Sequence, residues 1–376
     1  MHLKPFLLDE WLDAHEHHAE FNLGSSTGPV WTLNELLSLA TEEERGRFFH
    51  QKMVYSRPAG ADTLREAIAQ MYGVYTEAVQ VVTGASEALL ILFWLAAEPS
   101  ANVILPQPGF TTFSALPESL GLETRFYTLR KENNFRIDIE EIQKLADQNT
   151  KLVLINSPHN PTGATISDAE LDALHEFTSS RGIRLVSDEV YHPIFHGEPT
   201  RSASRLPAAT VIHDFSKAFP FSGVRTGWII DRNPKHRKDY WTARAYFSIT
   251  NNTLGEFLAE LAMRHREEVL RRTRKVATEN LRLLDTFMSQ HRETLGWIPP
   301  RGGMTAFPWL VSGENSREFC KAAAAKGIIL APGDCFDAPA HFRLGFAALP
   351  PEKFTEALSQ LSELVKTWAG ANLLKA

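Results

Sequence analysis

The sequence predicts an α/β protein whose main feature is a mostly parallel sheet of seven strands, with a smaller α+β region after it. From Val79 onward, short β-branched runs alternate with helix-like stretches, a pattern typical of a parallel sheet covered by helices. After about Thr253 the sequence changes to long, charged helical patterns. The length of 376 residues makes two domains the default expectation. We therefore expect a large domain over 51–255, a small C-terminal domain over 256–376, and an N-terminal segment over 1–50 that packs with the small domain and the active site.

Seven runs rich in β-branched residues are the predicted strands. In chain order they read VQVVT, NVILP, ETRFYTL, KLVLIN, IRLVSD, TVIHD and TGWII, beginning at Val79, Asn102, Glu123, Lys151, Ile183, Thr210 and Thr226. Helix-like stretches lie between several of them, and in one of these Ser167 is a predicted cap and Gly182 a predicted stop. Ligands of such sheets bind at the carboxyl ends of the strands.

Two helical regions and a capping motif lie outside this alternating part. The stretch EFLAELAMRHREEVLRRTRKVATENLRLLDTFM predicts long charged helices, and PEKFTEALSQLSELVKTWA predicts a last amphipathic helix. Near the N-terminus, Thr41 and Glu44 form a predicted capping box. These features are structural and carry no chemistry.

Composition excludes several classes of partner. Hydrophobic residues make up 43% and charged residues 22% of the chain, and the formal net charge is -6. Both signs are scattered, which argues against nucleic acid or an anionic membrane as the main partner. Cys320 and Cys335 are too few for a disulfide framework, and no signal-peptide core or membrane-length apolar run is present. We expect a cytoplasmic protein.

Three histidines near the N-terminus raise the question of a metal site. His15, His17 and His18 lack a fourth ligand at suitable spacing. A solvated helix face is the favoured interpretation, and we expect no metal.

Lys217 stands in the largely apolar stretch VIHDFSKAFPFSGVRTGWII. Such a lysine can lay its stem over apolar surface and keep its ammonium in water. It can also be held there because a desolvated amine loses its proton readily and attacks carbonyl carbon. The residue by itself leaves both interpretations open.

Two further motifs follow predicted strands. In TGASEALLILFW, the turn at Gly84, Ala85 and Ser86 leads from a strand into a helix, where backbone N–H groups can hold a phosphate. An ordinary turn is an equally good interpretation because the G-x-G-x-x-G fingerprint is absent. Asp188 ends an apolar strand, where a buried acid requires a partner. It could pair with a protonated ring nitrogen, or it could be a cap or half of an ion pair.

Together these motifs resemble the fold-type I pyridoxal 5′-phosphate (PLP) enzymes, specifically the class I and II aminotransferase family. The resemblance runs from about Tyr55 to Arg343 and rests on N-P-T-G, D-x-x-Y, S-K and an arginine eight residues after the lysine. It implies the PLP-dependent transferase fold, with PLP bound in the large domain. It also implies an aminotransferase that moves an amino group from an α-amino acid to a 2-oxo acid through a Schiff base at Lys217.

The resemblance assigns roles residue by residue. Lys217, Asp188 and Tyr191 form the catalytic set: Asp188 keeps the pyridine nitrogen protonated, so that the ring can act as an electron sink, and Lys217 shuttles the proton. The resemblance implies further cofactor contacts. Asn160 and Tyr191 would bind the 3-oxygen, and Arg225 with the backbone of Ala85 and Ser86 would bind the phosphate. Ser216 would contact the cofactor beside the lysine, Phe110 would stack on the ring face, and Tyr55 would reach the phosphate of the neighbouring subunit of a homodimer. Arg343 would grip the substrate α-carboxylate in a bidentate manner, and Gly24 would line the substrate site.

Two departures from the family pattern leave alternatives open. The position three residues before the lysine, usually Ser or Thr, is Asp214. Either the phosphate cup is altered or Asp214 faces a cation such as Arg225. The N-terminal stretch FNLGSSTGPVWTLNELL resembles capreomycidine synthase-like members, so a PLP-dependent lyase or cyclase is the alternative function. Arg301, in PPRGGMTAF, is either a turn residue or a substrate contact. A DNA-binding regulator is disfavoured because no basic helix-turn-helix precedes Tyr55.

Overall fold

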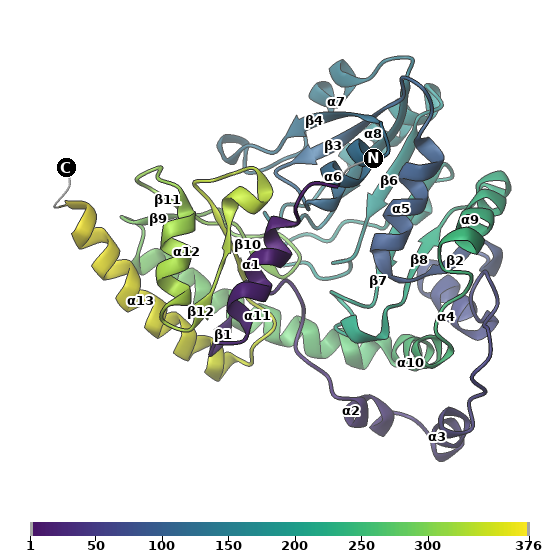
Figure 1. Ribbon diagram of the computed structural model, residues 1–376, viewed down its shortest axis with the longest axis horizontal. Coiled ribbons are helices and arrows are strands. Elements are labelled where there is room, and N and C mark those ends of the chain that lie inside the picture. The colour runs from purple at the N-terminus through teal and green to yellow at the C-terminus, as the bar shows by residue number, and fades with distance from the viewer. Residues whose placement is uncertain (1–2, 374–376) are drawn as a thin grey trace.

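The computed structural model describes residues 3–373 and is built around one seven-stranded sheet (Figure 1). The strand order is β2-β8-β7-β6-β5-β3-β4. The strands are β2 (Val79–Val82), β3 (Asn102–Gln107), β4 (Glu123–Thr128), β5 (Thr150–Asn156), β6 (Arg184–Asp188), β7 (Ala209–Asp214) and β8 (Gly227–Ile230). Each of the seven predicted runs forms one of these strands, so the predicted fold class is confirmed.

Register brings polar strand ends together. Strands β3 to β7 are parallel to one another, whereas β8 is antiparallel to both β2 and β7. Asn156, the last residue of β5, is the register partner of Asp188, the last residue of β6. Asp214 ends β7, the next strand across the sheet. Three polar side chains therefore lie at the carboxyl edge of adjacent strands, where a ligand of such a sheet binds.

Both faces of the sheet are covered by apolar side chains and helices. Val153 and Ile155 belong to one buried cluster, while Leu152 and Leu154 belong to the other, as the alternation of side chains along a strand requires. The helices that accompany the sheet are α4 (Asp62–Tyr72), α5 (Gly84–Ala96), α6 (Thr112–Ser119), α7 (Ile139–Leu145), α8 (Asp168–Ser180) and α9 (Pro234–Phe247). Helix α8 begins with a complete capping box at Ser167, as expected.

The C-terminal third is mainly helical. Its helices are α10 (Thr253–Arg264), α11 (Arg266–Gln290), α12 (Ser316–Ala324) and α13 (Pro351–Leu373). The short strands among them are β9 (Leu295–Gly296), β10 (Thr305–Ala306), β11 (Trp309–Leu310), β12 (Ile328–Ile329), β13 (Ala331–Pro332) and β14 (Phe342–Gly345). Strand β14 lies between β10 and β13 in a three-stranded antiparallel sheet. None of the helices described between residues 3 and 373 is long and apolar enough to cross a membrane.

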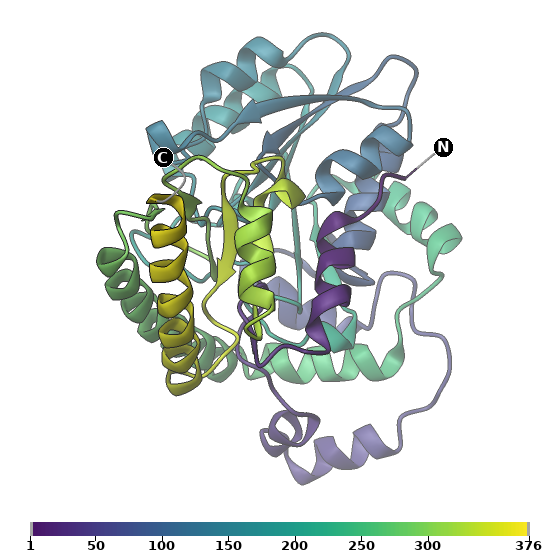
Figure 2. The same cartoon turned by 60° about the vertical axis from the view of Figure 1, so that its left-hand side comes forward.

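The N-terminal segment contacts distant parts of the chain. Helix α1 (Leu7–Glu16) lies beside the C-terminal elements, and β1 (Phe21–Asn22) pairs in parallel with β12 (Figure 1). Helices α2 (Leu33–Ser38) and α3 (Glu42–Phe49) lie at the edge of the ribbon in both views (Figures 1 and 2), where Glu35 pairs with Arg272 and Phe48 packs on Phe257. The predicted capping box at the start of α3 is present. The segment is thus docked beyond β1, since Gly24 and Ser26 bond Arg343 and Lys217, whereas residues from about 29 to 55 form a peripheral part, here called the projecting segment.

Candidate active site

A cavity of about 350 Å³ opens at the carboxyl ends of β5, β6 and β7. Helix α1, the start of α5 and strand β14 also contribute to its wall. The residues of the expected site that line it are Ala85, Ser86, Phe110, Asn160, Asp188, Tyr191, Ser216, Lys217, Arg225 and Arg343. Sequence motifs that are up to 258 positions apart therefore meet in one cavity.

Lys217 follows β7 and points its amine into the cavity. Its Nζ donates a hydrogen bond to Ser26 Oγ at 2.9 Å. Burial lowers the pKa of Lys217 to about 8, because the ammonium loses its hydration, while the nearby Asp214 carboxylate opposes this shift. At pH 7 about a tenth of the amine is then free of its proton, far more than for an ordinary lysine, and a nucleophile or a base requires that free form.

Asp188 is a buried acid with a raised pKa. Its side chain at the end of β6 is 5% exposed, and its Oδ1 accepts a hydrogen bond from the Val190 N–H at 3.1 Å. Burial raises the pKa of Asp188 to about 7, and Asp214 adds to the rise. Near neutral pH this carboxyl group is therefore partly protonated. A cation bound beside it would stabilise the ionised form, so the group can hold a cationic partner strongly.

Tyr191 and Asn160 present polar atoms beside Asp188. The Tyr191 hydroxyl is buried and has no hydrogen-bond partner within residues 3–373. Burial raises the pKa of Tyr191 to about 12, so the phenol is a neutral donor. Asn160 Oδ1 accepts a hydrogen bond from Arg343 Nη1 at 3.1 Å, which leaves the Asn160 NH₂ group as its free donor.

Arg343 lies in β14 with its guanidinium inside the protein. The side chain is 2% exposed, and its Nη2 donates to the Gly24 carbonyl oxygen at 2.6 Å. Its Nε has no partner within the described chain, and burial lowers the pKa of the guanidinium. An arginine that is buried without a carboxylate partner is a candidate anion site. Gly24, an expected substrate residue, contributes its backbone oxygen to this site.

Arg225 and the start of α5 form the expected phosphate end of the cavity. Arg225 adopts a left-handed conformation (φ 51°) and its Nη1 donates to the Ser222 carbonyl oxygen at 3.0 Å. Gly84 also has positive φ, and a Cβ there would lie 2.7 Å from Arg225 Nη2. Only glycine allows the guanidinium this close to the first turn of α5.

Asp214 does not pair with Arg225 among residues 3–373. Its Oδ2 accepts hydrogen bonds from the Ala85 N–H at 3.3 Å and from Ser216 Oγ at 2.9 Å, and its Oδ1 accepts one from the Ser216 N–H at 2.9 Å. The sequence left two alternatives for Asp214, an altered phosphate-binding site or a pairing with a cation such as Arg225. The structure favours the altered phosphate-binding site, called the phosphate cup below.

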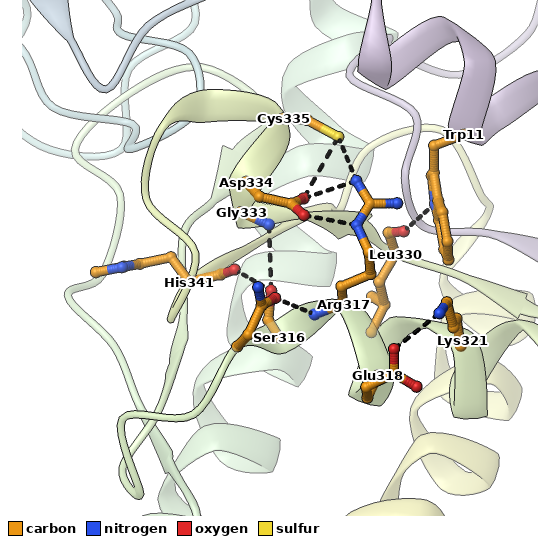
Figure 3. A network of polar contacts seen from close by, with 11 residues as sticks. Trp11, Ser316, Arg317, Glu318, Lys321, Leu330, Gly333, Asp334, Cys335 and His341 are labelled. Atoms are coloured by element: carbon orange, nitrogen blue, oxygen red, sulfur yellow. Dashed lines mark hydrogen bonds and ion pairs between the residues drawn. The ribbon is translucent and has the colours of Figure 1, made fainter.

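Helix α1 forms one wall of the cavity and is held there by the network in Figure 3. The Trp11 indole N–H donates to the Leu330 carbonyl oxygen at 2.8 Å. The Arg317 guanidinium lies 5.3 Å from the centre of the Trp11 ring and forms two hydrogen bonds with Asp334. The opposite side of α1 places Asp9 in the cavity wall.

Sequence reasoning missed Ser26, Asp9 and Asn156, which all line the cavity. Asn156 had a usable signal, because it ends a predicted strand; its Oδ1 accepts a hydrogen bond from the Asn160 N–H at 2.8 Å. Ser26 lies two residues after Gly24 in the stretch FNLGSSTGPVWTLNELL, which the sequence already placed at the active site, but nothing singled out its hydroxyl. Asp9 lies on a helix without a recognisable motif.

Three other expected residues have different surroundings. Phe110 lines the cavity and packs edge-to-face on Phe113, with ring centres 5.9 Å apart. Tyr55 is 78% exposed and does not line the cavity of its own chain. Arg301 is exposed and lies outside the cavity wall, so a turn residue is the better interpretation.

Comparison with known proteins identifies the group to which this arrangement corresponds. Residues 21–361 match the family described as aminotransferase class I and II. Capreomycidine synthase of Streptomyces vinaceus is 26% identical over 367 residues, covering 96% of this chain and 94% of that protein. Aspartate aminotransferase of Thermotoga maritima is 27% identical over 339 residues, covering 86% and 87%. The crystal structure of a PLP-dependent aminotransferase from Streptococcus suis 89-1591 superposes with a TM-score of 0.92 at 28% identity, covering 98% of this chain and 99% of that one.

Proposed function

The chain belongs to the aminotransferase class I and II family and its cofactor is pyridoxal 5′-phosphate; from that premise we propose that it transfers the amino group of an α-amino acid to a 2-oxo acid. The observation that supports this most is the common cavity of Lys217, Asp188 and Arg343. An amine with a lowered pKa, an acid with a raised pKa and a buried guanidinium are the three groups that this reaction needs.

The residues present fit PLP in their chemistry. Asp188 would face the pyridine nitrogen, whose positive charge would satisfy the buried carboxylate. The unpartnered Tyr191 hydroxyl and the Asn160 NH₂ group would donate to the ring oxygen. Phe110 would lie on the ring face. Arg225, Ser216 and the N–H groups at the start of α5 would hold the phosphate.

When bound, PLP supplies an electron sink for the charge that develops on the substrate α-carbon. Asp188 holds a proton at the ring nitrogen and so keeps this sink positive. Lys217 accepts the proton from the α-carbon, because the pKa of its amine lies near working pH. Ser26 orients the Lys217 amine through the 2.9 Å hydrogen bond.

Arg343 would bind the substrate α-carboxylate. Its Nη1 and Nη2 groups are fixed by Asn160 and Gly24, which sets the plane of the guanidinium before substrate arrives. The unpartnered Nε is then available for a charge-assisted hydrogen bond. The low exposure of the side chain strengthens that bond, because little water competes for it.

We propose further that the chain forms a homodimer whose sites use Tyr55 of the partner. The projecting segment carries exposed apolar side chains at Phe49, Met53, Val54 and Tyr55, each at least 64% exposed. Apolar side chains grouped in this way are typical of a protein interface. The division into a large domain over 51–255 and a small domain over 256–376 belongs to the same proposal.

A PLP-dependent cyclase or lyase is the second candidate. It is supported by the similarity to capreomycidine synthase, which extends over 96% of this chain and includes the N-terminal segment. Removal of the α-proton by Lys217 is common to both functions. They differ in the fate of the amino group, which a cyclase or lyase does not leave on the cofactor.

A donor screen separates these functions. The PLP-loaded protein is mixed with single α-amino acids, and the cofactor absorbance is followed together with the products. The proposal expects conversion of the cofactor to its aminated form and release of one equivalent of 2-oxo acid. Ammonia with an oxo acid, or a cyclised amino acid with unchanged cofactor, would instead identify the lyase or the cyclase.

A further inference from the structure

Asp214 places a negative charge where the proposed function requires a second anion to bind. It ends β7, three residues before Lys217, and its side chain is 6% exposed and lines the cavity. The carboxylate accepts three hydrogen bonds, from the Ala85 N–H, the Ser216 N–H and the Ser216 hydroxyl. Both residues belong to the expected phosphate site.

The contacts of Asp214 follow from its position opposite α5. The Ala85 N–H lies in the first turn of this 13-residue helix, where backbone donors lack partners within the helix. A carboxylate there is stabilised by the helix dipole as well as by the hydrogen bonds. Within residues 3–373 the cup is therefore closed by an anion of the chain itself.

Arg225 remains available to a second anion. It forms no ion pair among the described residues, and its one hydrogen bond goes to the Ser222 carbonyl oxygen at 3.0 Å. Its guanidinium lies against Gly84 at the start of α5. The buried Tyr191 hydroxyl lines the same cavity and has no hydrogen-bond partner of normal geometry within the described residues, so it can donate to a ligand bound there.

We propose that Asp214 is a built-in anion that closes the phosphate cup before the cofactor binds, and that binding of the cofactor phosphate brings one additional proton into the cup. Two unprotonated anions that share the Ala85 and Ser216 donors repel each other, and the repulsion is weakly screened because Ala85, Asp214 and Ser216 are buried. One proton removes this conflict, because a protonated carboxyl group becomes a donor to a phosphate oxygen. The inference rests on the proposed function, since it assumes that the cup binds a phosphate.

Other titratable groups near Asp214 can also take up or release protons when the cofactor binds. Lys217, Asp188, Tyr191 and His213 interact with Asp214 electrostatically, His213 from the preceding position of β7, and Arg225 lines the same cavity. Tyr191 and His213 keep one protonation state between pH 6 and 9, because burial raises the pKa of Tyr191 to about 12 and lowers that of His213 to about 4. Lys217 and Asp188 titrate within that range. The contribution of Asp214 must therefore be measured as a difference between variants.

The test uses pyridoxamine 5′-phosphate and the full chain freed of cofactor. This probe has no aldehyde, so it forms no covalent bond with Lys217. Its affinity is measured between pH 6.5 and 9 for the wild type and for Asp214→Asn, and the protons taken up are measured by calorimetry in buffers of different ionisation enthalpy. Pyridoxamine, which lacks the phosphate, is the matched probe. Asp231→Asn is the matched variant, because Asp231 is a buried carboxylate that bonds Tyr240 and His236 outside the cavity.

We expect the wild type to take up about one proton more than Asp214→Asn at pH 8. Its affinity should fall about tenfold more per pH unit than that of the variant. At pH 8.5, Asp214→Asn should bind pyridoxamine 5′-phosphate at least tenfold more tightly than the wild type. Pyridoxamine should show neither difference, and Asp231→Asn should behave as the wild type does.

Equal proton uptake in the wild type and Asp214→Asn, or an equal effect on pyridoxamine, would overturn the inference. If Asp214→Asn does not fold, Asp214→Ser replaces it. If neither variant folds, the wild type alone is compared with the two probes. Uptake of about one proton with pyridoxamine 5′-phosphate but not with pyridoxamine would support the inference, and no proton uptake would overturn it. Failure of the wild type to bind either probe would instead contradict the proposed function.

Discussion

Lys217 Nζ donates a hydrogen bond to Ser26 Oγ at 2.9 Å, although the two residues are 191 positions apart. Lys217 follows the central sheet, whereas Ser26 lies in the N-terminal segment just after β1. The contact therefore ties the orientation of the proposed base to the docking of the N-terminal segment. The sequence predicts that this segment packs at the active site, but it does not predict that Ser26 contacts Lys217.

Replacing Ser26 with alanine should lower kcat by about five- to thirtyfold, because a buried hydrogen bond of about 1–2 kcal/mol that orients the amine is lost. KM should change less than threefold. Ser26→Thr keeps the hydroxyl and should retain most of the activity, and Ser38→Ala, on the exposed face of α2, should be indistinguishable from the wild type. Steady-state kinetics with a donor found in the screen measures these effects. An unchanged kcat in Ser26→Ala would show that Lys217 needs no such orientation.

Arg343→Lys should raise KM for the amino donor by roughly ten- to a hundredfold. A lysine is a point charge and cannot keep the bonds to Asn160 and Gly24 while it binds a carboxylate. We expect the matched variant Arg301→Lys to leave KM within twofold, since Arg301 lies outside the cavity wall. If the two variants behaved alike, Arg343 would not be the carboxylate site.

Asp188 should make the cofactor-free protein less stable as pH rises from about 4 to 7. Its pKa in the folded chain is about 7, against an ordinary value of 3.8, so in this window the folded state binds a proton that the unfolded state does not. Above pH 7 the cost of the buried charge is constant. The free energy of unfolding of Asp188→Asn should therefore be higher than that of the wild type at pH 8, by about a few kcal/mol. The difference should vanish below pH 4.

Asp231→Asn is the control, because its effect on the free energy of unfolding at pH 8 should be opposite in sign to that of Asp188→Asn. Burial raises the pKa of Asp231, but hydrogen bonds from His236 and Tyr240 outweigh burial and lower it overall. This carboxylate stabilises the fold above its ordinary pKa, so its replacement should destabilise the protein at pH 8. Equilibrium denaturation of both cofactor-free variants at pH 4 and pH 8 provides the comparison. Destabilisation by Asp188→Asn at pH 8 would contradict the buried-charge account.

Mixed dimers test the partner role of Tyr55. A hybrid of one Tyr55→Phe subunit and one Lys217→Ala subunit has one site with both changes and one with neither, provided that Tyr55 acts across the interface. Co-refolded hybrids should then recover about half of the wild-type activity per dimer. Recovery should be absent if both residues serve the site of one subunit. Activity that persists fully in a diluted monomer would contradict the dimer itself.

The fold could be predicted from the sequence because each of its signals is local. Most of the seven strands are short apolar runs such as KLVLIN, and the central ones are apolar on both faces because helices cover the sheet on both sides. The edge strand β4 (ETRFYT) is the exception and is mostly not buried. The polar strand end at Asp188 was likewise a local signal, whereas the roles expected for Asp188 and Lys217 came from the resemblance to a family and not from the local sequence. Their convergence follows from parallel register, which aligns the carboxyl ends.

The rest of the site depends on tertiary packing. Helix α1 lies at the cavity because Trp11 bonds Leu330 and packs on Arg317, contacts that join positions more than 300 apart. The sequence predicts that the N-terminal segment packs at the active site, but it does not show that Asp9 and Ser26 are the residues that reach the cavity. Asp214 was recognised as unusual, but its contacts with Ala85 and Ser216 depend on the distance between the end of β7 and the start of α5. Local sequence does not contain that distance.

The central claim is that Lys217 is the residue through which this chain handles PLP. The most direct measurement is reduction of the PLP-loaded protein with borohydride, followed by digestion and mass spectrometry of the labelled peptide. We expect one phosphopyridoxyl group per chain, on Lys217, and its loss when an amino donor is added before reduction. Lys217→Ala should show no label, whereas Lys144→Ala, at an exposed position on α7, should be labelled like the wild type. A label on another lysine, or a label on Lys217 that no amino acid removes, would contradict the account.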